Sequence, residues 1–345
     1  MMDMISSLER LSNAVGVGGL TQAADEAQSM LGEFCDEIER DALGNVIGYR
    51  RCGGENARLL LLEAHIDEVG LIVTDIDDMG FIHAAPCGGV DVRALPAAEV
   101  MIFGDKPYPG VICSIPPHLK KKDDKDILPD IVDMGIDVGM NAEEAKSHIR
   151  QGSRISFKPN FTALDDYHVS GKAMDDRAGV AAILYCLDIL KEQQTETDYD
   201  IAVIFAVQEE LGCRGAAVSA YRVSPDYAIA VDVSFALTPD ADSAKCGRLG
   251  EGAMIGRSPT LDNCMANQLV KLAEENDIPY QNEVMGGATG TDAESISDAH
   301  AGIPTALLSV PLRYMHTPSE LIDIRDVQNV GRLMALFAEK GGSGL

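Results

Sequence analysis

Two adjacent glutamates, Glu209 and Glu210, follow the apolar segment 201–207 after a single residue, Gln208. This segment is long enough for a strand buried on both faces, and it would end at the two carboxylates. Successive side chains of a strand point in opposite directions, so the two glutamates face different neighbours. One carboxylate could bind a cation while the other faces the molecule that the cation activates. Two solvated glutamates at a strand end are the simpler alternative, and this pair alone does not decide between them.

Three other apolar segments end at residues that can bind metals. Segments 58–64, 227–231 and 305–310 are followed by His65, Asp232 and, after a short connection, His316. In open α/β sheets, ligand sites form outside the carboxyl ends of the strands. Asp175 precedes an expected helix over 178–191, where a cap of the helix N-terminus is the alternative role. The candidates expected at this edge of the sheet are His65, Asp175, Glu210, Asp232 and His316.

These candidates form a mixed nitrogen and oxygen ligand set of two imidazoles and three carboxylates. Such a set suits zinc, cobalt or manganese rather than calcium or a thiolate-bound metal. Five ligands exceed the needs of one tetrahedral ion and suit two ions about 3.5–4 Å apart that share a carboxylate. Asp67 lies two residues after His65, on the same side of an extended chain, where it could orient the imidazole. We therefore expect two divalent metal ions per subunit, with zinc favoured over cobalt or manganese.

The elements that position these residues show two different sequence patterns. A regular alternation of helices and strands occupies residues 1–68 and 164–345, whereas residues 69–163 contain short strand-like segments separated by Gly, Pro and Asp. Many short strands with frequent turns are typical of a small β barrel or sandwich. The sequence therefore predicts an α/β fold with an inserted small β-barrel domain at residues 69–163.

Hydrophobic periodicity also predicts the individual elements. Helices are expected over residues 6–15, 22–39, 142–150, 178–191, 212–221, 263–276 and 324–338. Strands of the α/β part are expected over residues 46–50, 58–64, 201–207, 227–231 and 305–310. Strands of the insertion are expected over residues 70–74, 81–84, 99–103, 111–114 and 154–157, and segment 237–254 is expected to be irregular.

Charge and cysteine usage limit the classes of function and location. The formal net charge is −27, which argues against binding to nucleic acid or anionic membranes because both need a basic face. No apolar run approaches the roughly 20 residues of a membrane span, and the start of the chain lacks the pattern of a signal peptide. The eight cysteines are scattered without a CxxC pair, so we expect reduced thiols and a cytoplasmic protein.

Six motifs together resemble those of the tetrahedral (TET) dinuclear-metal aminopeptidases of the zinc-peptidase clan MH. They are residues 65–70 (His-Ile-Asp-Glu-Val-Gly), 172–177 (Lys-Ala-Met-Asp-Asp-Arg), 208–212 (Gln-Glu-Glu-Leu-Gly), 231–232 (Val-Asp), 290–293 (Gly-Thr-Asp-Ala) and 313–318 (Arg-Tyr-Met-His-Thr-Pro). Relatives in this group are called glutamyl aminopeptidase, deblocking aminopeptidase or endoglucanase. The resemblance covers nearly the whole chain in order, and the inserted β domain is also a family feature.

The resemblance implies a role for each candidate residue. Asp175 would bridge the two metal ions. His65 and Asp232 would complete the first metal site, and Glu210 and His316 would complete the second. The two catalytic residues would be Glu209 as the general base and Asp67 as the carboxylate that orients His65. A cis peptide bond between Asp175 and Asp176 is implied as well.

The same resemblance implies the fold, the assembly and the activity. The α/β part would be zinc-exopeptidase-like, with a central mixed sheet flanked by helices. Dimers would assemble into a homo-oligomeric dodecamer, and the insertion would serve oligomerisation and substrate access. The expected function is a metal-dependent aminopeptidase that removes N-terminal residues from peptide substrates.

Two alternatives to an aminopeptidase stay open at this point. One is another hydrolase of the same clan, namely a deacylase, a carboxypeptidase or a glucanase. A glycosidase usually needs two carboxylates that flank the sugar rather than five metal ligands. The other is an inactive assembly protein, against which the complete ligand set and Glu209 argue. The preferred N-terminal residue and the native metal are not fixed by the sequence.

Overall fold

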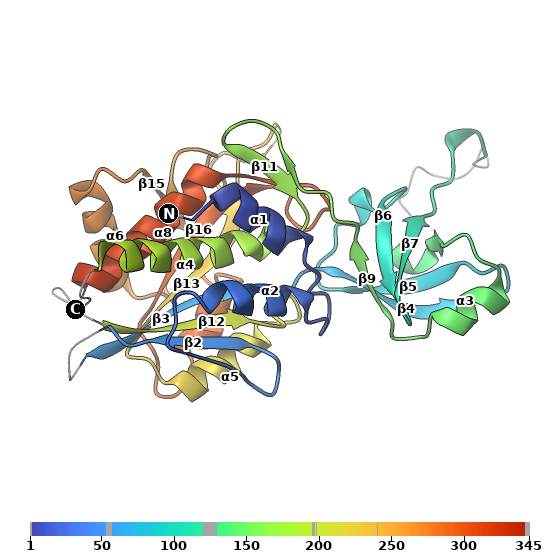
Figure 1. Cartoon of the computed structure of the whole chain (residues 1–345). Helices are drawn as coiled ribbons and strands as arrows, with labels where there is room; N and C mark the ends of the chain where they lie inside the picture. Colours follow the sequence, from blue (N-terminus) through green and yellow to red (C-terminus); the bar gives the residue numbers. More distant parts are fainter. Residues whose placement is uncertain are drawn as a thin grey trace.

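The computed structural model describes residues 2–52, 57–119, 130–194, 197, 199–239 and 241–341. Figure 1 shows two lobes, a large α/β body and a smaller β lobe that projects from one side of it. The chain leaves the body after β3 (Arg58–His65) and returns to it at β10 (Thr162–Ala163). Within the described residues, no helix is long and apolar enough to cross a bilayer.

The body is built on an 11-stranded mixed sheet, and this confirms the predicted fold class. Its central strands β12, β3, β13 and β16 are parallel, whereas β2 and β17 pair with them antiparallel. The path of the sheet is β1-β2-β12-β3-β13-β16-β17-β11-β10, and β14 pairs with β15 and β16. The other strands are β1 (Glu37–Arg40), β2 (Val46–Arg50), β11 (His168–Gly171), β12 (Tyr199–Ala206), β13 (Tyr227–Phe235), β14 (Ala253–Arg257), β15 (Tyr280–Val284), β16 (Thr305–Arg313) and β17 (Glu320–Asp323).

Helices cover both faces of this sheet, as Figure 1 shows for α4 and α8 on one face and α5 on the other. The described helices of the body are α1 (Met4–Asn13), α2 (Gln22–Leu31), α4 (Met174–Gln193), α5 (Arg214–Val223), α6 (Asn263–Glu275), α7 (Asp292–Ser297) and α8 (Ile324–Lys340). Successive side chains of each central strand point to opposite faces of the sheet and so pack into two separate hydrophobic cores. One core joins the sheet to α1, α2, α4, α6 and α8, and the other joins it to α5 and α7.

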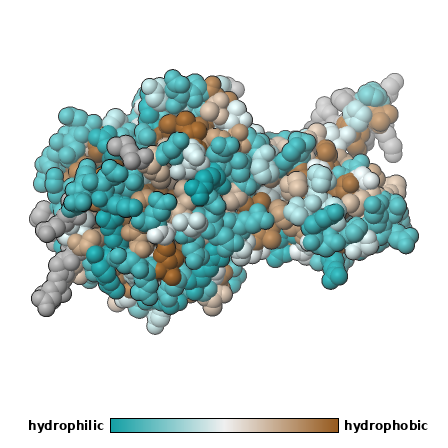
Figure 2. Space-filling view, in the orientation of Figure 1, coloured by the Kyte–Doolittle hydropathy of each residue, from teal (hydrophilic) through white to brown (hydrophobic). Residues whose placement is uncertain are grey.

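The insertion forms a closed barrel in the order β4-β5-β8-β7-β6-β9, as the sequence predicts. Its elements are β4 (Gly70–Ile76), β5 (Ile82–Cys87), β6 (Glu99–Phe103), β7 (Pro107–Ile112), β8 (Gly135–Asp137), α3 (Ala142–His148) and β9 (Arg154–Phe157). Inward-facing Val, Ile and Leu residues give the barrel its own apolar core. On the face shown in Figure 2, hydrophilic side chains predominate over both lobes, with small hydrophobic patches between them.

Several predicted boundaries are wrong. The helix expected over 22–39 ends at Leu31, because residues 37–40 instead pair antiparallel with β2. Strand β7 starts four residues earlier than expected, and its Pro107 and Pro109 have outward-facing, exposed positions. Neither proline is paired with β8, so neither has to donate a hydrogen bond to that neighbour. Strand β13 continues through Asp232 to Phe235, since its pairing with β16 extends that far.

Candidate metal centre

The centre forms at the carboxyl ends of the central parallel strands. His65 is the last residue of β3, and Glu209 and Glu210 follow β12 after a short turn. Leu61 and Ala230 belong to the core under α5 and α7, and His65 and Asp232 continue the same alternation along β3 and β13. Strand periodicity therefore aims both side chains at the same face of the sheet.

Asp175 joins the centre from the start of α4. Asp175 and Asp176 have non-helical backbone angles, and a cis peptide bond links them as expected. The Asp176 carboxylate accepts a hydrogen bond of 2.9 Å from the backbone N–H of Gly179. A Cβ atom at position 179 would lie 2.3 Å from that carboxylate, so this close approach requires glycine. The turn thus separates the two aspartates, and Asp175 faces the ends of the strands.

Two groups of potential ligands meet at Asp175. In the first group, His65 Nε2 lies 2.9 Å from Asp175 Oδ1 and 4.0 Å from Asp232 Oδ1. In the second group, His316 Nε2 lies 3.3 Å from Asp175 Oδ2 and 3.4 Å from Glu210 Oε1. Within each group, the donor atoms all lie within 4.8 Å of one another. The two oxygens of one carboxylate therefore face two separate sets of donors.

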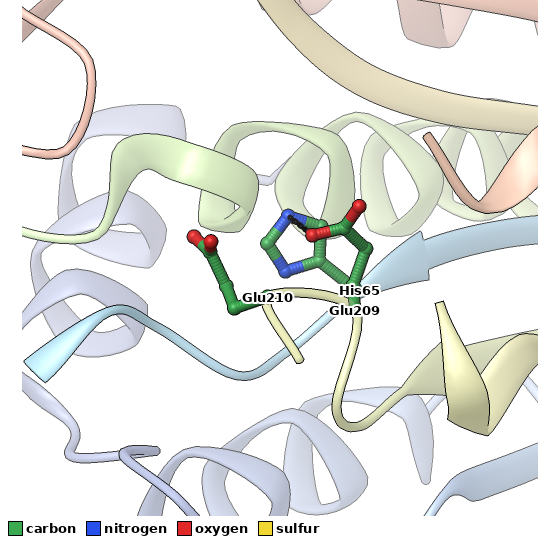
Figure 3. Close-up of side chains that lie close together, drawn as sticks. All are labelled: His65, Glu209 and Glu210. Atoms are coloured by element: carbon green, nitrogen blue, oxygen red, sulfur yellow. Dashed lines mark ion pairs between the residues drawn. The ribbon is translucent and has the colours of Figure 1, made fainter. Parts of the chain in front are cut away.

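Glu209 and Glu210 lie on two sides of the His65 ring, as Figure 3 shows. Glu209 Oε2 is 3.9 Å from His65 Nε2, whereas Glu210 belongs to the group around His316. A third arrangement of donors, His65 with both glutamates, also satisfies the 4.8 Å distance. That arrangement leaves Asp175 and Asp232 without a role, whereas the two groups that share Asp175 use all five predicted ligands. Glu209 is then the spare carboxylate of the centre.

Three further contacts orient the histidines and the loop of the glutamates. Asp67 Oδ1 lies 3.6 Å from His65 Nδ1 and accepts a hydrogen bond of 3.0 Å from the backbone N–H of Glu209. His316 Nδ1 lies 2.7 Å from the backbone carbonyl of Gly89, which fits an N–H donor at that position. The bond to Gly89 would leave His316 Nε2 free of a proton and available as a ligand.

Glu320 is a contributor to this centre that sequence analysis missed. It is 2% exposed, and its carboxylate accepts hydrogen bonds from the backbone N–H groups of Asp175 and His316. Gly89 was missed as well, because nothing in its sequence context links it to His316. For Glu320 a signal existed, namely an acidic residue four positions after the candidate ligand His316.

Electrostatics at the centre favour a bound cation. Burial raises the pKa of Glu210 to about 8, and the Asp175 carboxylate adds to this effect. Burial also raises the pKa of Asp232 well above its usual range, as does the nearby Asp176. Burial acts against ionisation of Asp175 too, but the hydrogen bonds with His316 and His65 lower its pKa. Crowded, dehydrated carboxylates of this kind are stabilised by a positive charge placed among them.

Protein cations do not supply that charge within the described part of the chain. The ion pairs of Asp175, Glu209, Glu210 and Asp232 there are all with histidine. The nearby Lys172 instead pairs with Glu68 at 2.7 Å. The donor set of two imidazoles and three carboxylates thus fits divalent ions of the zinc, cobalt or manganese type.

The centre opens into a cavity of about 860 Å³. Asp175, Glu209, Glu210, Asp232 and His316 form part of its wall. The remaining wall comes mainly from β13–β16 and the connections around them, with apolar residues such as Met254 and Leu307. A cavity of this size beside a polar cluster can hold a peptide end.

Comparison with known proteins places the chain among peptidases. The family model described as M42 glutamyl aminopeptidase matches residues 44–333. The lysyl aminopeptidase of Pyrococcus furiosus is 33% identical over 343 residues, which cover 96% of this chain and 96% of that protein.

Solved structures give the same result. An aminopeptidase from the archaeon Desulfurococcus kamchatkensis is 33% identical with a TM-score of 0.90, covering 98% of this chain and 94% of that chain. The TET1 peptidase of Pyrococcus horikoshii is 30% identical with a TM-score of 0.85, covering 98% of this chain and all of that one. That peptidase can assemble into a tetrahedron or a large octahedral shell.

Proposed function

Since the chain belongs to the M42 glutamyl aminopeptidase family and is an aminopeptidase, we propose that it uses two divalent metal ions to remove N-terminal residues from peptides. The observation that carries this proposal is the position of Asp175, whose two carboxylate oxygens face two donor groups. His65, Asp175 and Asp232 would hold one ion. Asp175, Glu210 and His316 would hold the other. Zinc is the favoured metal, with cobalt or manganese as alternatives.

The metal ions would supply Lewis acid chemistry. When bound, two divalent ions would lower the pKa of a water molecule towards about 7 and would polarise the scissile carbonyl group. Glu209 would take the proton from this water and return it to the leaving amine, a role worth roughly 10²–10⁴ in rate. Its carboxylate lines the cavity and is not needed by either donor group around Asp175.

Neighbouring residues would hold this machinery in place. Asp67 would orient His65 while its other contact fixes the backbone of Glu209. Residues around a metal centre that act in this way commonly change metal affinity or activity 10–100-fold when they are mutated. A free substrate amino group can coordinate a metal ion, and this would favour exopeptidase over endopeptidase action.

Metal analysis combined with two matched variants tests the proposal. The purified protein should bind two divalent ions per subunit and hydrolyse aminoacyl anilides. Glu209→Gln should keep both ions and lose roughly 10²–10⁴ in kcat. Glu210→Gln, which removes the same charge one residue away, should instead reduce the metal content. A Glu209→Gln enzyme with near-normal kcat would exclude Glu209 as the base.

The same assays separate the rival functions. Activity on N-acylated amino acids, peptide C-termini or glucans, without activity on aminoacyl anilides, would favour a deacylase, a carboxypeptidase or a glucanase. A protein that binds no metal and cleaves none of these substrates would be an assembly protein with a vestigial site.

We also propose a domain division and an assembly. Residues 1–68 and 164–345 would form the catalytic domain, and residues 69–163 would serve oligomerisation and substrate access in a dodecamer assembled from dimers. The assembly of the Pyrococcus horikoshii TET1 peptidase supports this proposal. Large apolar side chains on the insertion support it too, since Met79, Ile115, Leu119 and Val132 are more than half exposed. Eight cysteines without a disulfide support a cytoplasmic location.

A further inference from the structure

A fifth carboxylate lines the cavity, apart from those of the metal centre. Glu283 in β15 accepts a hydrogen bond of 2.7 Å from Ser309 Oγ through its Oε2 atom. Its Oε1 atom accepts a second hydrogen bond from the Ser234 hydroxyl. These two serines fix the Glu283 carboxylate in one position and leave each of its oxygens able to accept another donor.

This carboxylate lies close to the metal centre. Ser309 is the partner of Asp232 in the register between β16 and β13. Ser234 is two residues beyond Asp232 on β13, so strand alternation directs its side chain to the same face as that of Asp232. The two serines that hold Glu283 therefore flank a proposed metal ligand, one on the next strand and one further along the same strand. A substrate bound at the metals would place its first side chain within reach of Glu283.

The surroundings of Glu283 are suited to a long side chain with a positive end. Met254, Leu307 and Met285 line the same cavity and offer apolar surface to an aliphatic stem. Burial raises the pKa of Glu283, whereas the two serine hydroxyls act in the opposite direction. Within the described residues, no Lys or Arg forms an ion pair with Glu283. Lys245 also lines the cavity, but its side chain is exposed to solvent.

Resting on the proposed aminopeptidase function, we infer that Glu283 binds the ammonium or guanidinium group of a basic N-terminal residue of the substrate. Glu283 is thus a specificity residue that favours peptides beginning with Lys or Arg. A charge-assisted hydrogen bond in a partly dehydrated site gives discrimination of roughly tenfold to hundredfold over a neutral side chain of similar length. An acidic first residue would meet a like charge and would be disfavoured.

The wild-type enzyme provides the first test. We compare kcat/KM for the anilides of lysine and norleucine, since norleucine retains the unbranched aliphatic stem and lacks the ammonium group. Lysine should be preferred roughly tenfold to hundredfold, and glutamate should be the poorest of the three. Equal values for lysine and norleucine, or a preference for norleucine, would overturn the inference without any variant having to fold.

The second test changes the charge alone. Glu283→Gln keeps the length of the side chain and its capacity to bond a serine, and it should lower the lysine-to-norleucine ratio of kcat/KM to near one. Glu275→Gln removes the same charge from an exposed position on α6 and should leave the ratio unchanged. An unchanged ratio in Glu283→Gln, with a normal circular dichroism spectrum, would contradict the inference.

The same measurements distinguish a failure of the role of Glu283 from a failure of the proposed aminopeptidase function. If the metal-loaded enzyme cleaves leucine and norleucine anilides without favouring lysine, only the role of Glu283 is wrong. If it cleaves none of the anilides, the proposed aminopeptidase chemistry is wrong.

Discussion

The Glu320 carboxylate accepts a hydrogen bond of 3.1 Å from the backbone N–H of Asp175, although 145 residues separate the two in sequence. Its other oxygen accepts a hydrogen bond of 2.7 Å from the backbone N–H of His316. One buried carboxylate thus ties together the backbones that carry a proposed bridging ligand and a proposed terminal ligand. The spacing between Asp175 and His316 therefore depends on this link.

Replacing Glu320 should therefore weaken metal binding without removing a ligand. In Glu320→Ala, two buried backbone N–H groups lose their acceptor, and we expect metal affinity to fall roughly 10–100-fold. Glu320→Gln keeps one carbonyl acceptor and should have a smaller effect. Calorimetric titration of the metal-free protein with zinc measures both variants. Wild-type affinity in Glu320→Ala would show that the link has no such role.

A methyl group at position 89 should disturb His316. A Cβ atom there would lie 3.0 Å from His316 Nδ1 and 3.2 Å from its Cε1, so the imidazole must shift. We expect Gly89→Ala to lower kcat and to reduce occupancy of the site formed by Glu210 and His316. Gly135→Ala in the same barrel is the control, because its Cβ would meet no atom closer than 3.4 Å. Equal metal content in the two variants would contradict the prediction.

The buried pair of Lys172 and Glu68 should contribute strongly to stability. Both side chains are almost fully buried, and Glu68 also accepts a hydrogen bond of 2.8 Å from the backbone N–H of Gly16. Lys172→Met leaves the Glu68 charge buried without its partner, so we expect a loss of about 3–5 kcal/mol. Thermal unfolding of the metal-loaded protein measures this loss. The double variant Lys172→Met with Glu68→Gln should recover part of it, whereas no recovery would mean that lost packing is the cause.

Asp326 should make stability depend on pH. Burial raises the pKa of its carboxyl to about 7, although the N–H groups of Gly250 and Gly252 act in the opposite direction. The folded state then binds the proton more tightly than the unfolded state, whose Asp pKa is about 3.9. The contribution of Asp326 to the free energy of unfolding is therefore largest below pH 4, and it is lost as the pH rises to about 7.

Replacing the Asp326 carboxyl with a group that does not titrate should make the free energy of unfolding less dependent on pH. Asp326→Asn is expected to show a smaller decrease in the free energy of unfolding between pH 4 and 7 than the wild type does. Denaturant unfolding at a series of pH values gives the slope for each protein. A constant difference in the free energy of unfolding between the two proteins is compatible with the prediction. In Asp326→Asn an NH₂ group replaces one of the two oxygens that accept from the N–H groups of Gly250 and Gly252. Identical slopes would contradict it.

The strand ends were predictable from sequence because buried parallel strands are continuous apolar runs. His65 follows such a run directly and Glu210 follows one after a short turn, so their place at one edge of the sheet required only the rule for open α/β sheets. The barrel was predictable as a class from its short strands and frequent turns. Its exact pairing was not, since β8 has three residues and no pattern of its own.

The residues that sequence analysis missed depend on long-range register. Glu283 faces the cavity only because β15 pairs with β14, which in turn pairs with β16, and the sequence predicted neither β14 nor β15. The end of α2 was missed for a similar reason, since residues 37–40 become a strand by pairing with β2. Local propensity contains no information about such partners.

The carbonyl of Gly89 belongs to the connection between β5 and β6, so the barrel lobe supplies part of the support of His316. The backbone N–H of Asp91, in the same connection, donates to the carbonyl of His316 as well. In a chimera whose barrel comes from a relative, the backbone groups that contact His316 would also come from that relative. Chimeras that keep this chain's own residues 88–91 should stay active. The two lobes should therefore evolve as one unit.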